Sequence, residues 1–213
     1  MAIEVADGLK EAGCEVHIKQ VPETLSEEVL KKMYAVDQKS AKDHPLAKVE
    51  ELPDYDGFMF GIPTRYGTMP AQWKAFWDAT GGLWQKGALV GKPAGIFFST
   101  STLGGGQETT ALTTLTALTH HGLLFVPLGY TTPDLMNLSE VHGGRFVTLL
   151  KTFSFFFVGK ERETLLLTAP YGAGTLSGTD GKRQPSDLEK RVARHHGAHV
   201  GHVIAALFNG KGK

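Results

Sequence analysis

The sequence TRYG, residues 64–67, forms one short polar loop after the apolar run at 57–60. The apolar run is typical of a buried strand, and Pro70 is typical of the first turn of a helix. The guanidinium of Arg65 is a planar fork of hydrogen-bond donors, and Tyr66 places an aromatic ring beside it. The loop therefore predicts a binding site for a planar, anionic ligand.

A second polar loop, STSTLGGGQ at residues 99–107, follows another apolar run, PAGIFF at 93–98. Its glycines allow backbone N–H groups to approach a ligand, and the start of the next helix favours an anion or an electron-rich carbonyl. The loop is neither a Walker sequence nor a dinucleotide fingerprint, so a flexible turn is the alternative. Its pairing with the loop at 64–67 favours ligand binding.

Strand and helix patterns alternate along the chain and predict an α/β fold in one domain, residues 1–213. Helices are expected at 1–12, 26–34, 107–121 and 186–208, and another begins at Pro70. Strands are expected at 14–21, 56–62, 93–100 and 122–130. Apolar strands separated by helices indicate a doubly wound parallel sheet, whose ligands bind at the carboxyl ends of the strands. Both polar loops follow such ends.

The overall composition argues against several classes of partner. The 213 residues carry 22 Lys plus Arg and 22 Asp plus Glu, so no net charge attracts nucleic acid or an anionic membrane. The apolar run at 146–158 is interrupted by Lys151 and is too short to cross a bilayer. A lone cysteine, Cys14, and the absence of a signal-type segment favour a reducing compartment. A soluble cytoplasmic protein is expected.

The histidines leave several interpretations open. His120 and His121 end a predicted helix, where one can point towards the ligand edge or both can simply interact with the helix dipole. His195, His199 and His202 have a spacing that metal sites use, but no acidic or cysteine ligand stands near them in sequence, so no metal is predicted.

The residue pattern also bears on a serine hydrolase and on an aromatic pocket. Ser99 and Ser101 follow a strand without a Gly-x-Ser-x-Gly elbow, which disfavours hydrolysis. Trp73 and Trp77 share a helical face and are expected in the core. Trp84 follows two glycines and is expected to wall a pocket.

Several long motifs resemble one family in the right order: YDGFMFGIPTRYGTMPAQWKAFWDATGGLW, KGALVGKPAGIFFSTSTLGGGQETT, LTHHGLLFVPLGY and PYGAGTLSGTDGKRQPS. They resemble the WrbA-type NAD(P)H:quinone oxidoreductases in their fungal or yeast-like form, over nearly the whole chain except residues 145–169. The resemblance implies a flavodoxin-like fold, FMN as cofactor, NAD(P)H as electron donor, a quinone substrate and a homotetramer.

The resemblance also implies roles for particular positions. Thr64, Arg65 and Tyr66 would contact the pyrimidine edge of the flavin. A second group would line its other side, namely Ser99, Thr100, Ser101, Thr102, Leu103 and Gly104.

Three further positions match residues of the family's active site. His120 matches a histidine at the cofactor and Tyr130 matches a tyrosine, and both are expected to act in catalysis with Arg65. Trp84 matches a tryptophan that walls the substrate pocket, over the flavin of a neighbouring subunit.

The sequence departs from the family at its start. The family begins with a strand and a Tyr-Ser-x-x-Gly-His type of loop whose amides hold the FMN phosphate, whereas Met1 falls inside the expected first helix. In the strand order 2-1-3-4-5 that strand lies inside the sheet. Its absence predicts unpaired edges on the strands at 14–21 and 56–62 and weaker binding of FMN.

A second departure is an insertion of 25 residues at 145–169, where relatives have almost none. Its abrupt boundaries suggest a translated intron. An alternative is that FVTLLKTFSFFFV, residues 146–158, supplies a replacement strand. The two departures leave a second functional hypothesis open, in which the chain is a non-catalytic flavodoxin-like subunit or the product of a faulty gene model with impaired FMN binding.

Overall fold

The computed structural model describes residues 1–33, 44–137, 139–143, 145–146, 167–168 and 170–208. The α-helices are α1 (Ala2–Glu11), α2 (Glu27–Lys32), α3 (Ala71–Asp78), α4 (Gly81–Gln85), α5 (Gln107–His120) and α6 (Asp187–Phe208). The strands are β1 (Phe58–Pro63), β2 (Pro93–Thr100), β3 (Leu124–Phe125), β4 (Arg145–Phe146), β5 (Leu167–Thr168) and β6 (Gly174–Leu176). Two 3₁₀ helices are η2 (Val49–Asp54) and η3 (Pro133–Met136).

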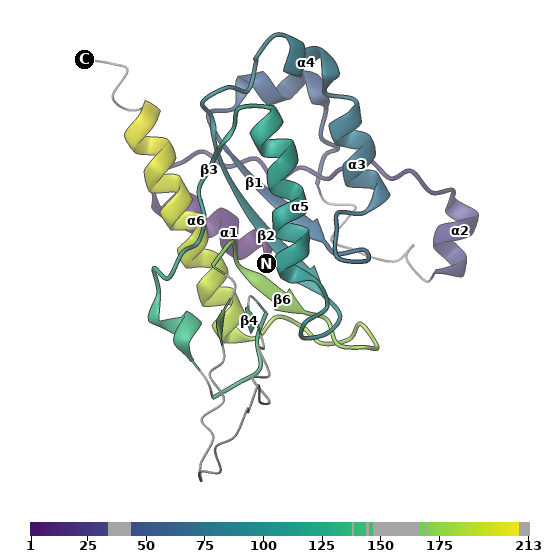
Figure 1. Cartoon of the computed structure of the whole chain (residues 1–213), viewed down its shortest axis with the longest axis vertical. Coiled ribbons are helices and arrows are strands. Elements are labelled where there is room, and N and C mark those ends of the chain that lie inside the picture. Colours follow the sequence, from purple (N-terminus) through teal and green to yellow (C-terminus); the bar gives the residue numbers. More distant parts are fainter. Residues whose placement is uncertain (34–43, 138, 144, 147–166, 169, 209–213) are drawn as a thin grey trace, which may run out of the picture.

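The sheet is parallel and is centred on β2 (Figure 1). Strand β1 pairs with β2 over six residues, from Phe58 opposite Ala94 to Pro63 opposite Ser99. On the other side of β2, β3 pairs with its beginning and β6 pairs with its end. The helices lie on both faces of this sheet, which confirms the predicted α/β fold.

Alternating side chains of the strands face two different helical layers. Towards α3 and α5, a cluster of buried residues includes Phe60, Ile62, Ile96, Phe98, Phe76, Trp77 and Leu118. Towards α1 and α6, a second cluster includes Val5, Leu9, Leu128 and Val192, with Met59 and Phe97 packed against it. The sheet is therefore held between two apolar layers, which fixes the positions of its strand ends.

Glycines bring α1 and α6 into direct backbone contact. A Cβ atom added to Gly8 would lie 1.9 Å from the carbonyl oxygen of Arg194, and one added to Gly197 would lie 2.1 Å from that of Val5. Only hydrogen fits in such a space, so these glycines set the approach of the two helices.

The strand expected at 14–21 is not formed. In that segment a single parallel bridge joins Gln20 to Leu46, and the backbone bonds Gln20 N to Pro45 O at 2.9 Å and Ala47 N to Gln20 O at 2.8 Å. A strand needs a neighbouring ladder, and among the described residues β1 pairs with β2 alone. The sequence had the right alternation, but no partner strand lies beside this segment in the described part of the chain.

The strand expected at 122–130 is shorter than predicted. Two short strands, β3 and β6, occupy the position beside β2 that it was expected to fill. Only Leu124 and Phe125 form β3, and the chain resumes the same side of β2 at β6. Between them β4 and β5 pair antiparallel, Arg145 opposite Thr168. Most of the expected insertion at 145–169, including most of the proposed replacement strand, lies outside the described residues.

Buried polar side chains of α6 hold β6 and the segments on either side of it. Glu189 is 1% exposed and accepts hydrogen bonds from several groups, namely the amides of Gly143 and Ser186, the hydroxyl of Thr175 and the guanidinium of Arg183. His196 is fully buried, and its Nδ1 accepts from Ala173 N at 3.3 Å. Burial lowers the pKa of His196 to about 3, so it is neutral at physiological pH.

Candidate functional site

The loops that follow β1 and β2 lie side by side at the carboxyl end of the sheet. Pro63 is in register with Ser99, and Thr64 N donates to Ser99 O at 2.9 Å. Further out, a Cβ atom on Gly106 would lie 2.7 Å from the Cα of Gly67. The structure therefore brings together the two loops that the sequence predicted as a binding site.

The first loop is a tight turn that presents Arg65 and Tyr66 to solvent. Arg65 N donates to Thr68 O at 2.8 Å, and Thr68 N donates back to Arg65 O at 3.1 Å. The central residues Tyr66 and Gly67 have φ angles of 52° and 77°. A tyrosine in the left-handed region is unusual, and its side chain is fully exposed. Such strain often occurs at ligand sites.

The second loop offers backbone donors. Among the described residues, the amides of Ser101, Thr102, Leu103 and Gly104 take part in no backbone–backbone hydrogen bond, whereas Gly105 N donates to Thr102 O at 3.1 Å. The loop runs directly into the amino terminus of α5, whose partial positive charge adds to these donors. The arrangement suits carbonyl oxygens or negative charge on a ligand.

Two buried residues of α5 lie under these loops, and the sequence analysis missed both. Thr110 Oγ1 lies 2.9 Å from Thr64 Oγ1 and donates to Gly106 O at 2.6 Å. Gln107 Nε2 donates to Thr100 Oγ1 at 3.0 Å and to Thr175 O at 3.1 Å. The available signal was a pair of polar residues three apart, directly after a glycine-rich loop, on the helix face that turns inward.

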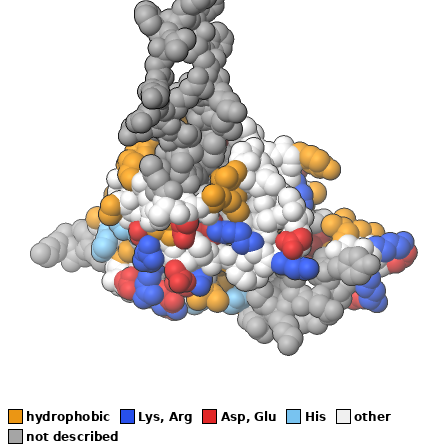
Figure 2. All heavy atoms as spheres, turned by 90° about the horizontal axis from the view of Figure 1, so that it is seen from below, with side chains coloured by type: hydrophobic (Ala, Val, Ile, Leu, Met, Phe, Trp, Pro, Cys, Tyr) orange, Lys and Arg blue, Asp and Glu red, His pale blue; other side chains and the backbone are white. Residues whose placement is uncertain are grey.

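The charges at this end of the molecule are mixed. Figure 2 views the protein from below and shows Lys and Arg side chains interspersed with Asp and Glu, rather than gathered by sign. Arg65 donates to the neighbouring carbonyl Thr64 O at 3.0 Å through Nη1, and its side chain is otherwise exposed. The site is therefore defined by particular donors rather than by a broad electrostatic field.

The histidine pair lies at the opposite end of the sheet, so the expectation that one of them points towards the polar loops is wrong for a single chain. Gly91 N donates to Gly122 O at 2.9 Å, next to the start of β2, whereas the loops follow its end. Eight residues of β2 span roughly 25 Å at the usual strand rise. Helix α5 runs antiparallel to β2 and carries its carboxyl terminus to the amino end of the sheet.

His121 is part of the core at that end. Thr80 Oγ1 donates to Trp77 O at 2.6 Å, so His121 Nε2 is the donor in its 2.8 Å contact with the Thr80 hydroxyl. The His121 ring also packs on Trp77, with ring centroids 5.4 Å apart. Burial lowers the pKa of His121, and neighbouring His120 lowers it further.

His120 and Trp84, by contrast, face outward at the amino end. His120 Nδ1 donates to Thr116 O at 2.7 Å, because a backbone carbonyl only accepts, and this leaves Nε2 as the outer ring atom. Trp84 is 58% exposed on α4. Trp73 and Trp77 pack in the aromatic cluster around Phe60, as expected.

Tyr130 lies beside α6 rather than with Arg65. Its neighbours Gly129 and Thr131 bond to Pro170 O at 2.8 Å and to His195 Nε2 at 2.8 Å, respectively. The described residues contain no group of three or more potential metal ligands. A single chain thus brings together the two loops, but not His120, Trp84 or Tyr130.

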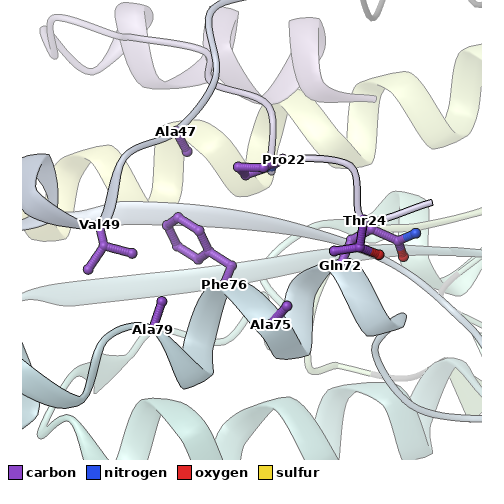
Figure 3. A pocket seen from close by; sticks show the side chains of 8 residues that line it. All are labelled: Pro22, Thr24, Ala47, Val49, Gln72, Ala75, Phe76 and Ala79. Carbon is purple, nitrogen blue, oxygen red and sulfur yellow. The ribbon is translucent and has the colours of Figure 1, made fainter. Parts of the chain in front are cut away.

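A small apolar cavity of about 200 Å³ lies between the segments 22–24 and 47–49 and one side of α3 (Figure 3). Phe76 and Ala79 point into it, and Gln72 closes one end by donating to Glu23 Oε1 at 2.6 Å. Its lining includes no residue of the two polar loops, so it is separate from the candidate site.

The fold and this site define a flavodoxin-like α/β protein. The chain resembles the solved flavodoxin, WrbA-like protein from Agrobacterium tumefaciens with a TM-score of 0.55 and 21% identity, over 96% of this chain and 87% of that one. This likeness concerns the fold alone. None of the helices in the described part of the chain is long and apolar enough to cross a membrane.

Sequence comparison places the chain more narrowly. Residues 1–133 match the NADPH-dependent FMN reductase family. The quinone-oxidoreductase QR2 of Triphysaria versicolor is 48% identical over 97% of this chain and 89% of its own length. The NAD(P)H quinone oxidoreductase PST3 of Candida albicans is 50% identical over 91% of this chain and 84% of its own. The chain belongs to the WrbA-type NAD(P)H:quinone oxidoreductase family.

The residues at the carboxyl end fit the ring of FMN, the cofactor that the family implies. The pyrimidine edge of a flavin carries two carbonyl oxygens and one N–H group. The loop at 101–104 offers amide donors, Arg65 offers a guanidinium, and the Thr64 hydroxyl lies directly after β1, next to the Thr110 hydroxyl. The exposed ring of Tyr66 can cover an aromatic surface.

Proposed function

We propose that this protein is an FMN-dependent quinone reductase that uses NAD(P)H as electron donor. The family assignment supports the reaction, and one observation supports the location. That observation is the pair of adjacent loops at 64–68 and 101–106. They carry Arg65 and the amides of residues 101–104, which donate to no backbone carbonyl in the described structure.

Bound FMN supplies the redox chemistry, in which NAD(P)H, a proton and a quinone become NAD(P)⁺ and a hydroquinone. The chain's own residues bind and orient the reactants. Arg65 would place a positive charge beside the pyrimidine edge of bound FMN, which becomes electron-rich when FMN accepts electrons. The amides of Ser101 to Gly104 would donate hydrogen bonds to the carbonyl oxygens of the same edge, and Tyr66 would limit access of water to the ring face.

We further propose that a homo-oligomer, most simply a tetramer, completes the site. His120 and Trp84 lie at the amino end of the sheet, roughly the length of β2 from Arg65. The same end exposes Val90 and Leu124, which are 65% and 46% accessible. A second copy docked with this end over the flavin loops would bury these apolar side chains and bring Trp84 over the ring.

In such an assembly His120 would present Nε2 to the substrate, because Nδ1 is committed to Thr116 O. A ring nitrogen at this position can hold or donate the proton that a reduced quinone oxygen takes up. Tyr130 is the third proposed catalytic side chain, and its phenol is a second proton donor.

The half-buried free thiol of Cys14 supports a cytoplasmic location, since it forms no disulfide among the described residues.

The function is tested by reconstituting the purified chain with FMN and measuring oxidation of NADPH and NADH in the presence of benzoquinone. The proposal expects turnover that depends on added FMN, and an Arg65→Ala variant with reduced turnover. Absence of FMN-dependent turnover in folded protein would favour the non-catalytic subunit instead.

The shared site is tested by coexpressing two variants with impaired turnover, Arg65→Ala and Trp84→Ala. If each site takes Arg65 from one chain and Trp84 from another, mixed pairs contain one intact site, and roughly a quarter of the wild-type activity returns. Coexpression of Trp84→Ala with His120→Ala is the control, because both changes lie on the same end and no intact site can form. Recovery in the control, or none in the first pair, would contradict the shared site.

A further inference from the structure

The first turn of α5 touches both candidate flavin loops from their buried side. Gln107 and Thr110 lie three residues apart and share the inward face of the helix. Gln107 bonds to Thr100 at the start of the second loop, and Thr100 Oγ1 in turn donates to Thr102 O at 3.0 Å. Thr110 bonds to Thr64 at the start of the first loop. One helical turn therefore connects the ends of β1 and β2.

The direction of these hydrogen bonds can be deduced from the protons available. A threonine hydroxyl has a single proton, and Thr110 donates its proton to Gly106 O at 2.6 Å. In the 2.9 Å contact between the two hydroxyls, Thr64 must then be the donor. The Thr64 proton thus points inward, and its oxygen is left with lone pairs for a partner on the open side of the loop.

We propose that Thr110 is a positioning residue for flavin binding, which acts by holding the Thr64 hydroxyl as a hydrogen-bond acceptor at the ring edge. This inference rests on the proposed function. The pyrimidine edge of a flavin has an N–H group between two carbonyl oxygens, so a site for it needs one acceptor among its donors. Thr64 is that acceptor, while Arg65 and the amides of the second loop are the donors.

The connection also explains how two exposed loops keep one relative position. Thr110 is 0% exposed, and its second partner, Gly106, is the residue whose Cα side packs against Gly67 of the first loop. A change at Thr110 therefore reaches both loops without contact with the ligand.

Thr114 provides a matched control on the same helix. It is also 0% exposed, and its hydroxyl also donates to the carbonyl four residues earlier, Thr110 O, at 2.7 Å. Such bonds from threonine to the preceding turn are common in helices and have little effect on stability. Thr114 differs from Thr110 in one respect that matters here, because it bonds to neither loop.

The experiment compares Thr110→Val, Thr110→Ser and Thr114→Val in the full chain. FMN affinity is measured by quenching of flavin fluorescence, and the visible absorption spectrum of the bound flavin is recorded at saturation. Valine has nearly the shape of threonine but lacks the hydroxyl, and removal of one buried hydrogen bond is expected to raise the FMN Kd of Thr110→Val by roughly three- to tenfold. Thr110→Ser should restore the wild-type Kd and spectrum, and Thr114→Val should leave both unchanged.

A double variant tests whether Thr110 acts through Thr64. In the Thr64→Val background, Thr110→Val should cause a much smaller loss of affinity than in the wild-type background, because the contact with Thr64 is already removed and only the bond to Gly106 O remains to be lost. Equal losses in Thr110→Val and Thr114→Val, no rescue by serine, or fully additive losses in the double variant would each overturn the inference. Failure of the wild-type chain to bind FMN would instead overturn the proposed function, so the two failures are distinguishable.

Discussion

The family resemblance assigns residues from both ends of the sheet to one active site. The two ends differ in the kinds of residues that they carry. At the carboxyl end, small and hydroxylated residues form two interlocked loops whose outer surface is rich in donors. At the amino end, a compact core of Trp77, Thr80 and His121 supports the outward-facing His120 and Trp84.

The two ends therefore contribute different parts of the candidate site. The carboxyl end has the donors and the open backbone geometry that bind a planar ligand, and it is assembled within one chain. The amino end has an aromatic wall and an imidazole, but within one chain these residues have nothing to face. Under the proposed assembly, cofactor binding is a property of one subunit and substrate enclosure is a property of the oligomer.

The largest expected effect separates two tryptophans of the amino end. Trp77 is 6% exposed and packs on Phe60 and His121, so Trp77→Ala should lower the free energy of unfolding by about 3–5 kcal/mol. Trp84 is 58% exposed, and Trp84→Ala should change it by less than about 0.5 kcal/mol while it lowers quinone reduction.

Urea denaturation followed by circular dichroism measures both variants. If Trp77→Ala and Trp84→Ala lose comparable stability, Trp84 is part of the core of its own chain, which would contradict its proposed contact with a neighbouring subunit. Trp77→Phe provides a milder variant if the alanine protein does not fold.

The next effect tests the close contact between the loops of the carboxyl end. Gly106 has a φ angle of 96°, and a Cβ atom there would meet the backbone of Gly67. The strain and the overlap together should cost about 3 kcal/mol, so Gly106→Ala should weaken FMN binding by about a hundredfold.

Gly104 is the matched control, since its φ angle is 66° but a Cβ atom would meet nothing within 4 Å. Gly104→Ala should therefore weaken binding much less, by about tenfold or less. If the two variants bind FMN equally well in a fluorescence titration, the contact between the loops does not determine affinity.

The smallest expected effect is a dependence of stability on pH. Burial lowers the folded-state pKa of His196 to about 3, while an unfolded histidine titrates near 6.5. The unfolded chain therefore binds the extra proton below pH 6.5, and stability that is fully present above that pH is lost progressively as the pH falls towards 3. His196 alone should lower the free energy of unfolding by about 1 kcal/mol between pH 6.5 and 5.5.

His121 should add to the same trend, because burial lowers its pKa too. Urea denaturation at pH 7.5, 6.5 and 5.5 measures the dependence. The loops at 64–68 and 101–106 contain no histidine, so this acid sensitivity belongs to the core and to the amino end. Stability that does not change over this range would contradict the burial of both rings.

The sequence predicted the elements whose pattern was strong and local. Ser26 caps α2 and accepts from Val29 N, Gly13 ends α1 with a φ angle of 85°, and α5 spans the predicted segment almost residue for residue. The two polar loops were also placed correctly, since residues after consecutive parallel strands meet at one end of the sheet.

The remaining errors arose where structure depends on distant partners. The alternation at 14–21 could not show that no neighbouring ladder lies beside it in the described structure. The residue pattern alone did not distinguish His120 from His121, although the resemblance singled out His120. The fold shows that His121 is buried against Thr80 while His120 faces outward. Thr110 was overlooked because a threonine in a helix has no local signature of its partner on another strand.

The most direct test of the account is an FMN titration of this chain, followed by quenching of flavin fluorescence, with Arg65→Ala and Arg191→Ala as a matched pair. Arg65 lies in the first loop, whereas Arg191 bonds to Asp134 at 3.1 Å on the outer side of α6. We expect saturable binding at micromolar FMN, a Kd raised at least roughly tenfold by Arg65→Ala, and no change in Arg191→Ala. Folded protein that does not quench the flavin, or binding that Arg65→Ala leaves unchanged, would contradict it.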